Sequence, residues 1–90
     1  MRSSAYKVPE GKLIKVKLWV TNESISKIII AGDFFLHPEE TITLIEENLI
    51  GTHLNAKSLE TSIRSCLADA GGILIGATPK DIADAIMIAK

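Results

Sequence analysis

The chain has 90 residues, of which 47% are hydrophobic, so it can form one domain with its own core and is too apolar for a disordered tail. Ten basic and eleven acidic residues give a net charge of −1, whereas nucleic-acid binders usually carry a basic surplus. A single cysteine excludes an internal disulfide, and no apolar run approaches the roughly 20 residues that span a bilayer. We therefore expect one cytoplasmic domain over residues 1–90, with no nucleic-acid and no membrane partner.

The charges are unevenly distributed along the chain. Residues 1–20 contain five basic residues and only one acidic residue, Glu10, whereas residues 33–50 contain five acidic residues and no Lys or Arg. Separated patches of opposite sign suit docking to a partner with complementary patches. Two ordinary solvated faces would give the same pattern.

The N-terminal third of the chain predicts a β-hairpin preceded by an arm. Residues 1–11 contain Pro9 and Gly11 and are expected to be irregular. Apolar residues then alternate with lysines, which is typical of a half-buried strand. Residues 21–24 supply turn chemistry, and the following run is rich in β-branched residues. The sequence thus predicts an antiparallel hairpin over residues 12–31.

The remainder of the chain has helical periodicity. We expect helices over residues 38–50, 56–70 and 79–89, with Pro38 as the first helical residue and with Asn55 and Thr78 as N-caps. The short apolar run at 73–75 is either a third strand or a buried loop. The pattern predicts a two-layer α+β domain, in which the N-terminal antiparallel hairpin, with or without this third short strand, packs against about three helices.

No motif in the sequence predicts an active site that could work alone. Gly11-Lys12 lacks both the earlier glycine and the following Ser or Thr of a phosphate-binding P-loop. His37 and His53 lie far apart without ligands at suitable spacing, so no metal site is expected. Cys66 falls on an apolar helix face, as a buried and unreactive thiol would.

Two segments are not accounted for by folding. The first is the basic turn over residues 7–12, which leads into a strand whose outward face carries two lysines and Trp19. The second is Phe34-Phe35, because neighbouring residues of an extended segment point to opposite sides. Either one ring faces a partner or ligand, or the two rings pack under the hairpin and the first helix.

In their order and spacing, these segments resemble the C-terminal accessory domain of lipoate-protein ligases. The resemblance rests on Lys7–Ile14 (KVPEGKLI), Gly32–Phe35 (GDFF), residues 38–40 (PEE), a short helix ending at Gly51, and residues 76–79 with the final helix. It covers nearly the whole chain and is weakest between residues 52 and 76. The family usually has a second glycine where this chain has Glu10.

The resemblance implies an ATP-dependent ligase that activates lipoate as lipoyl-AMP and then transfers the lipoyl group to a lysine of lipoyl carrier domains. Most of the family's pocket lies in a larger catalytic domain, for which 90 residues leave no room. Because the chain begins at Met1, we expect a separate small subunit that forms a heterodimer with a large catalytic subunit, although a piece cut from a longer chain would look the same. ATP, Mg²⁺ and lipoate are implied in the complex, and none is expected to bind this chain alone.

In such a complex, Lys12 and Lys7 are candidates to stabilise the charge that develops on the phosphates of ATP. Gly11 would allow the backbone to approach a phosphate closely. Alternatively, the two lysines pair with carboxylates of the partner. The predicted contact with the large subunit consists of Gly32, Asp33, Phe34, Phe35 and Trp19, with the phenyl rings as anchors and Asp33 as the orienting group.

Two other functions stay open at this stage. The chain could be a non-catalytic module that recognises the lipoyl acceptor domain or scaffolds the ligase, or a small homo-oligomer joined through the hairpin edge. In the accessory-subunit interpretation, the isolated chain is inactive.

Overall fold

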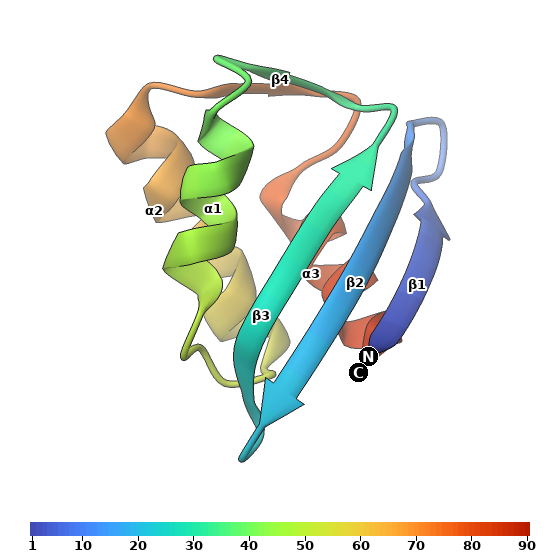
Figure 1. Ribbon diagram of the computed structural model, residues 1–90. Coiled ribbons are helices and arrows are strands. Elements are labelled where there is room, and N and C mark those ends of the chain that lie inside the picture. Colours follow the sequence, from blue (N-terminus) through green and yellow to red (C-terminus); the bar gives the residue numbers. More distant parts are fainter.

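The structure is a computed structural model that describes all 90 residues. Its elements are β1 (Arg2–Lys7), β2 (Leu13–Thr21), β3 (Ser24–Gly32), β4 (Phe35–His37), α1 (Thr41–Leu49), α2 (Ala56–Ala70), β5 (Ile73–Ile75) and α3 (Pro79–Ala89). The three helices lie against one face of the sheet β1-β2-β3, and the β4–β5 ribbon crosses one end of the molecule (Figure 1). The predicted α+β class is confirmed.

The predicted hairpin is formed by β2 and β3, which pair antiparallel from Ile14 opposite Gly32 to Thr21 opposite Ser24. Its turn consists of Asn22 and Glu23, whose φ values of 52° and 64° match a two-residue turn that follows the twist of the strands. In β2 the side chains of Ile14, Val16 and Leu18 are buried toward the helices and those of Lys15 and Lys17 face solvent, as the alternation predicts.

The expected irregular arm is wrong for residues 2–7, which form strand β1 and pair with β2. This strand has no run of large apolar residues, so its pattern is weak in the sequence. Tertiary contacts hold it instead: the Ser4 hydroxyl donates to the Ala85 carbonyl at 2.7 Å, and Tyr6 packs against the core. Only the turn over residues 8–12 is irregular.

The short run at 73–75 is a strand, but it does not extend the hairpin. It pairs antiparallel with β4, with Phe35 opposite Ile75 and His37 opposite Ile73. This pairing keeps the chain extended as far as His37, so α1 begins at Thr41 and the expected start at Pro38 is wrong. Residues 38–40 form a turn in which the Thr41 N–H donates to the Pro38 carbonyl at 3.0 Å.

The other two helices match their predicted ranges and caps. The Asn55 side chain accepts from the Ser58 N–H at 3.1 Å, and Gly71 ends α2 in the left-handed conformation. Thr78 and Asp81 form a reciprocal capping box at the start of α3. None of the three helices is long and apolar enough to cross a bilayer.

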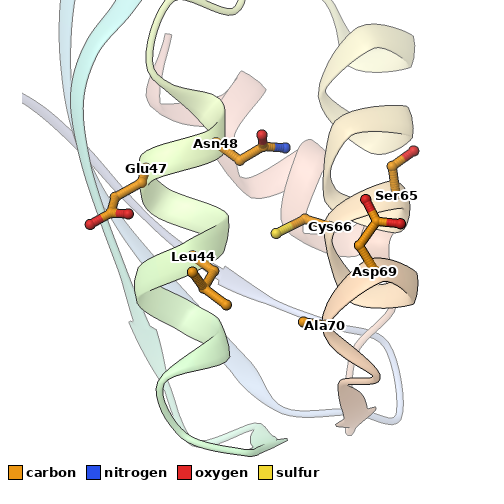
Figure 2. A pocket seen from close by; sticks show the side chains of 7 residues that line it. All are labelled: Leu44, Glu47, Asn48, Ser65, Cys66, Asp69 and Ala70. Carbon is orange, nitrogen blue, oxygen red and sulfur yellow. The ribbon is translucent and has the colours of Figure 1, made fainter.

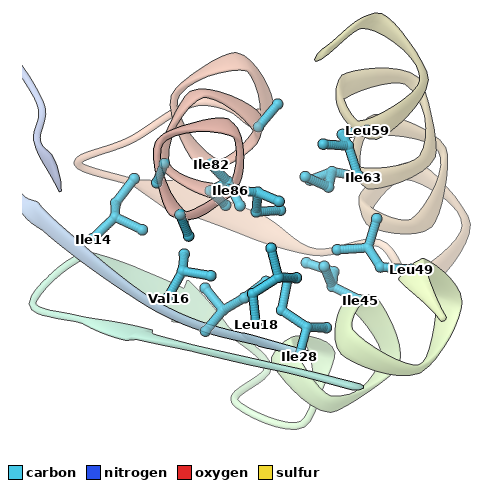
Figure 3. Packing of buried hydrophobic residues seen from close by; sticks show 14 of the residues in the cluster. Ile14, Val16, Leu18, Ile28, Ile45, Leu49, Leu59, Ile63, Ile82 and Ile86 are labelled. Carbon is cyan, nitrogen blue, oxygen red and sulfur yellow. The ribbon is translucent and has the colours of Figure 1, made fainter. Parts of the chain in front are cut away.

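The core lies between the sheet and the helices (Figure 3). It contains the inward side chains of β2 and β3 together with one apolar stripe from each helix. The largest fully buried side chains are Ile14, Leu18, Ile25, Ile45, Leu49, Leu59, Ile63, Ile82 and Ile86. This core fixes both the β1–β2 turn and the end of β3, where the candidate site is formed.

Candidate functional site

Three segments that are distant in the sequence meet at the end of the sheet crossed by the β4–β5 ribbon (Figure 1). The Lys12 N–H donates to the Gly76 carbonyl at 3.0 Å, which joins the β1–β2 turn to the residue after β5. The Leu13 N–H donates to Asp33 Oδ1 at 2.6 Å, and the Asp33 N–H donates to the Leu13 carbonyl at 3.2 Å. We call this assembly the motif end; it consists of residues 7–12, 32–33 and 76.

The turn of the motif end is tightly packed. The Val8 side chain is buried, its N–H donates to the Lys12 carbonyl at 3.0 Å, and its carbonyl accepts from Gly11 at 2.9 Å. A Cβ added to Gly11 would lie 2.8 Å from the Gly76 oxygen, so only glycine fits there. Glu10 has φ 58°, a conformation that glycine adopts with less strain, which explains why a glycine also suits this position.

Both lysines of the motif end are exposed. The Lys7 ammonium donates to the Gly11 carbonyl and is therefore held over the turn. The aliphatic part of Lys12 lies across Gly76, where an added Cβ would be 2.5 Å from Lys12 Cγ. The Lys12 ammonium forms no ion pair, because both ion pairs of the chain lie within α2 and α3. The motif end therefore presents one tethered and one unpaired cation to solvent.

The segment Gly32–Phe35 serves the fold and the surface in different ways. A Cβ on Gly32 would overlap the Leu13 carbonyl, and Asp33 holds the start of β2 through the hydrogen bonds given above. Phe34 is half-buried and packs against the core. Phe35 is 56% exposed and stacks on the His37 ring, with 6.3 Å between centroids and 7° between planes. Of the two rings, one thus packs inward and the other faces solvent.

Trp19 does not join this group. It lies on the outer face of β2, six residues beyond Leu13, a separation of roughly 20 Å along a strand. The Lys27 ammonium lies 4.9 Å from the centroid of the Trp19 ring, a cation–π contact across the hairpin. The residues predicted to form one partner contact are therefore divided between two surfaces.

An open groove of about 610 Å³ runs between α1 and α2 and contains the one cysteine (Figure 2). Burial, and secondarily the charge of Asp69, raises the pKa of the Cys66 thiol. A raised pKa keeps the thiol protonated and weakly nucleophilic at neutral pH. The chain contains no cluster of three or more His, Cys, Asp or Glu side chains that could hold a metal ion.

Comparison with known proteins places this arrangement in a family. The family model "Bacterial lipoate protein ligase C-terminus" matches residues 5–86. This range leaves out only the two termini of the chain and includes every segment of the motif end. The chain belongs to this family of lipoate protein ligase C-terminal domains. The resemblance inferred from the sequence motifs is thereby confirmed.

Two relatives of this family member match it over almost their whole length. Lipoate-protein ligase A subunit 2 of Thermoplasma acidophilum is 33% identical over 88 residues, covering 98% of this chain and 89% of the relative. A solved structure from a study of an archaeal lipoylation system, described as a bi-partite lipoate protein ligase and its E2 lipoyl domain from the same organism, matches with a TM-score of 0.79 and 32% identity. That match covers 93% of this chain and 91% of the other.

Sequence reasoning missed two features of this lipoate-ligase domain. One is the contact between Gly76 and Lys12, although Gly76 was part of the motif that carried the resemblance. The other is that Ile73 and Ile75 are more than half exposed beside Phe35, because a short apolar run predicts burial. Only the pairing of β4 with β5 shows which way these side chains point.

Proposed function

We propose that this chain is the accessory subunit of a two-part, ATP-dependent lipoate-protein ligase. With a large catalytic subunit it would support activation of lipoate to lipoyl-AMP, before transfer to a lysine of lipoyl carrier domains. The observation that carries the proposal is the two-way coverage of 98% and 89% with a relative named as ligase subunit 2. The match at a TM-score of 0.79 to a structure described as a bi-partite ligase supports the same two-part organisation.

In the adenylation step, a lipoate carboxylate oxygen attacks the α-phosphorus of ATP and pyrophosphate leaves. Negative charge develops on the phosphate oxygens, and a fixed cation in a site without water stabilises it. Lys12 suits this task because its ammonium is unpaired while its backbone N–H and its side-chain stem are both held against Gly76. Lys7 would add a second cation from the same turn.

The other residues of the motif end act as positioning residues in this proposal. The Gly11 N–H already donates to Val8, and the space beside Gly11 is filled by the Gly76 carbonyl. We therefore assign the contact with phosphate to the lysines, and the narrow turn that carries them to Gly11. Asp33 holds the start of β2. No set of three or more carboxylate, imidazole or thiol groups on this chain fits Mg²⁺, so no step is assigned to the ion here.

The test is ATP–pyrophosphate exchange in the presence of lipoate, measured with the large subunit alone, this chain alone, and both together. We expect exchange only from the mixture, and none from the isolated chain. A large subunit that exchanges equally fast alone would refute the adenylation role.

The proposal places this reaction in the cytoplasm, a reducing compartment that suits the free Cys66.

Substitution of the lysines tests the residue roles. At saturating small subunit, we expect Lys12→Ala to lower exchange about 30-fold or more, because the loss of a transition-state contact of this kind costs about 2–4 kcal/mol. Lys7→Ala should cost less, and Lys12→Arg should restore part of the rate. Lys57→Ala, which alters an exposed lysine on α2, is the matched control.

If the lysines only pair with carboxylates of the partner, the outcome differs. In that case Lys12→Ala raises the concentration of small subunit needed for half-maximal exchange, and the rate at saturation stays that of the wild type. This result would move Lys12 from the reacting site to the subunit contact.

A second function, recognition of the acceptor domain, is favoured by one observation. The outer face of the three-stranded sheet has lysines at positions 7, 15, 17 and 27 and no carboxylate, and Trp19 lies among them. Such a face attracts an acidic protein surface. It predicts that Lys15→Glu and Lys17→Glu raise the KM for a lipoyl acceptor domain and leave pyrophosphate exchange unchanged.

A further inference from the structure

The β4–β5 ribbon has an apolar outer face that the proposed reaction does not use. Its register places Phe35 opposite Ile75 and His37 opposite Ile73, so these four side chains share one side of the ribbon. Phe35, Ile73 and Ile75 are 56%, 56% and 57% exposed. The alternate residues, Leu36 and Leu74, point to the other side; Leu36 is buried, and Leu74 packs against the core.

The stability of the folded chain does not require apolar residues on this outer face. A half-buried ribbon normally alternates apolar residues toward the core with polar residues toward water. Here the outer side is also largely apolar, with His37 as its one polar residue, although only the inner side reaches the core. The remaining exposed large hydrophobic residues lie elsewhere in the chain: Met1, Ile29, Leu44, Ile50 and Ile88. A contiguous exposed apolar patch marks a site of protein contact.

We propose that the outer face of the β4–β5 ribbon is the surface on which the large catalytic subunit docks. This inference rests on the proposed function, and it names the contact through which the motif end reaches the catalytic site. The ribbon is continuous with the motif end, because Asp33 lies two residues before Phe35 and Gly76 directly follows Ile75. A subunit that covers the ribbon therefore lies beside Lys12, which is held against Gly76.

The charge next to the ribbon favours a different partner over a second copy of this chain. Glu39 and Glu40 lie just beyond β4, after Pro38, and are exposed. Two copies packed ribbon to ribbon around a two-fold axis near the His37 end would bring these four carboxylates toward one another, which is unfavourable. A partner of different sequence can place cations there instead.

The ribbon has the residue types expected at the centre of such a contact. A stable interface buries about 800 Å² on each partner, with a few large apolar anchors at its centre and polar residues around them. Three exposed apolar side chains, one of them aromatic, supply these anchors. Exposed polar groups on both sides, Glu39 and Lys12 among them, supply part of the polar margin.

The test measures the affinity of the small subunit for the large subunit by isothermal titration calorimetry. We expect Phe35→Ala to weaken binding about 30-fold and Ile75→Ala about tenfold, as for anchors at the centre of an interface. Ile88→Ala is the matched control, because Ile88 is 58% exposed and lies on α3; it should change the affinity less than about twofold. Thermal unfolding of each variant establishes that it is folded, and Ile73→Ala replaces any variant that is not.

Wild-type affinity in both Phe35→Ala and Ile75→Ala would overturn the proposal. So would a wild-type chain that sediments as a homodimer and becomes monomeric on Phe35→Ala, because the occupant would then be a second copy. Pyrophosphate exchange separates this failure from failure of the proposed function. If the wild-type chain binds through the ribbon without stimulating exchange, the docking surface stands and the adenylation role is refuted. If the wild-type chain stimulates exchange while the ribbon variants bind normally, the adenylation role stands and the docking surface is refuted.

Discussion

The two sheets of this domain use the same residue types in opposite ways. In the three-stranded sheet, Ile14 and Leu18 of β2 are completely buried, and Lys15 and Lys17 lie at alternate positions that face solvent. In the β4–β5 ribbon, Ile73 and Ile75 face solvent on one side while Leu36 is buried on the other. Along β2, buried apolar residues alternate with exposed lysines, as folding requires. The β4–β5 ribbon has apolar residues on its exposed side as well, which folding does not require.

The comparison separates residues that stabilise the chain from residues that are available to a partner. Burial of an isoleucine in a close-packed core stabilises the fold by several kcal/mol, whereas an exposed isoleucine contributes little. Ile73 and Ile75 are 56% and 57% exposed, so they add little to the stability of the isolated chain. The apolar outer side of the ribbon is therefore available to a partner, and the docking proposal assigns it to the catalytic subunit.

The largest expected effect contrasts an isoleucine from each sheet. Ile14→Ala should lower the free energy of unfolding by about 3–4 kcal/mol, because Ile14 is fully buried and the neighbouring strands cannot close the cavity. Ile75→Ala should lower it by less than about 1 kcal/mol. Urea denaturation of the two variants beside the wild type measures both values. A comparable loss in Ile75→Ala would mean that the ribbon is part of the core, and the contrast between the sheets would break down.

A smaller effect is expected at the junction between the sheets. Gly32 ends β3, and an added Cβ would overlap the Leu13 carbonyl, so we expect Gly32→Ala to cost about 2–3 kcal/mol as strands β2 and β3 separate locally. Gly51→Ala is the control, since an added Cβ there meets nothing within 4 Å and only the φ of 87° is unfavourable, costing about 1 kcal/mol. Equal losses in the two variants, again by urea denaturation, would show that the close approach at Gly32 can relax.

The fold was largely predictable because its signals are local. The alternation in β2, the side-chain cap at Asn55 and the capping box at Thr78 each act within a few residues, and each prediction is confirmed. Strand β1 and the start of α1 were predicted wrongly because they depend on distant partners. Ser4 and Tyr6 do not by themselves predict a strand, because the strand that contains them is held by its contacts with β2 and α3.

The candidate site was predictable only in part, for the same reason. Lys12, Gly11 and Asp33 could be selected as residues, but the hydrogen bond of Lys12 with Gly76 and those of Asp33 with Leu13 join segments that are distant in the sequence. Trp19 was placed in the same contact because its distance from Phe35 cannot be read from spacing. The roles of these residues toward lipoate and ATP stay predictions for the exchange assay.

The smallest expected effect concerns the hydrogen bond that links the two sheets. Asp33 lies between β3 and β4, and its carboxylate accepts from the Leu13 N–H at 2.6 Å, so it ties the base of the ribbon to the start of β2. Asp33→Ala should cost about 1 kcal/mol of global stability, the net value of one exposed hydrogen bond, and should speed exchange of the Leu13 amide hydrogen with solvent.

The variant Asp33→Asn retains an acceptor oxygen and should restore most of the protection of that amide. Asp69→Ala, a change at an exposed aspartate of α2, controls for the loss of a charge. Hydrogen exchange followed by NMR reads the effect at Leu13 itself. Faster exchange confined to residues around Leu13 would show that Asp33 holds the turn carrying Lys12 in place. Unchanged exchange at Leu13 would mean that β1 and β3 fix this turn without Asp33, and that the two sheets are coupled only through the chain.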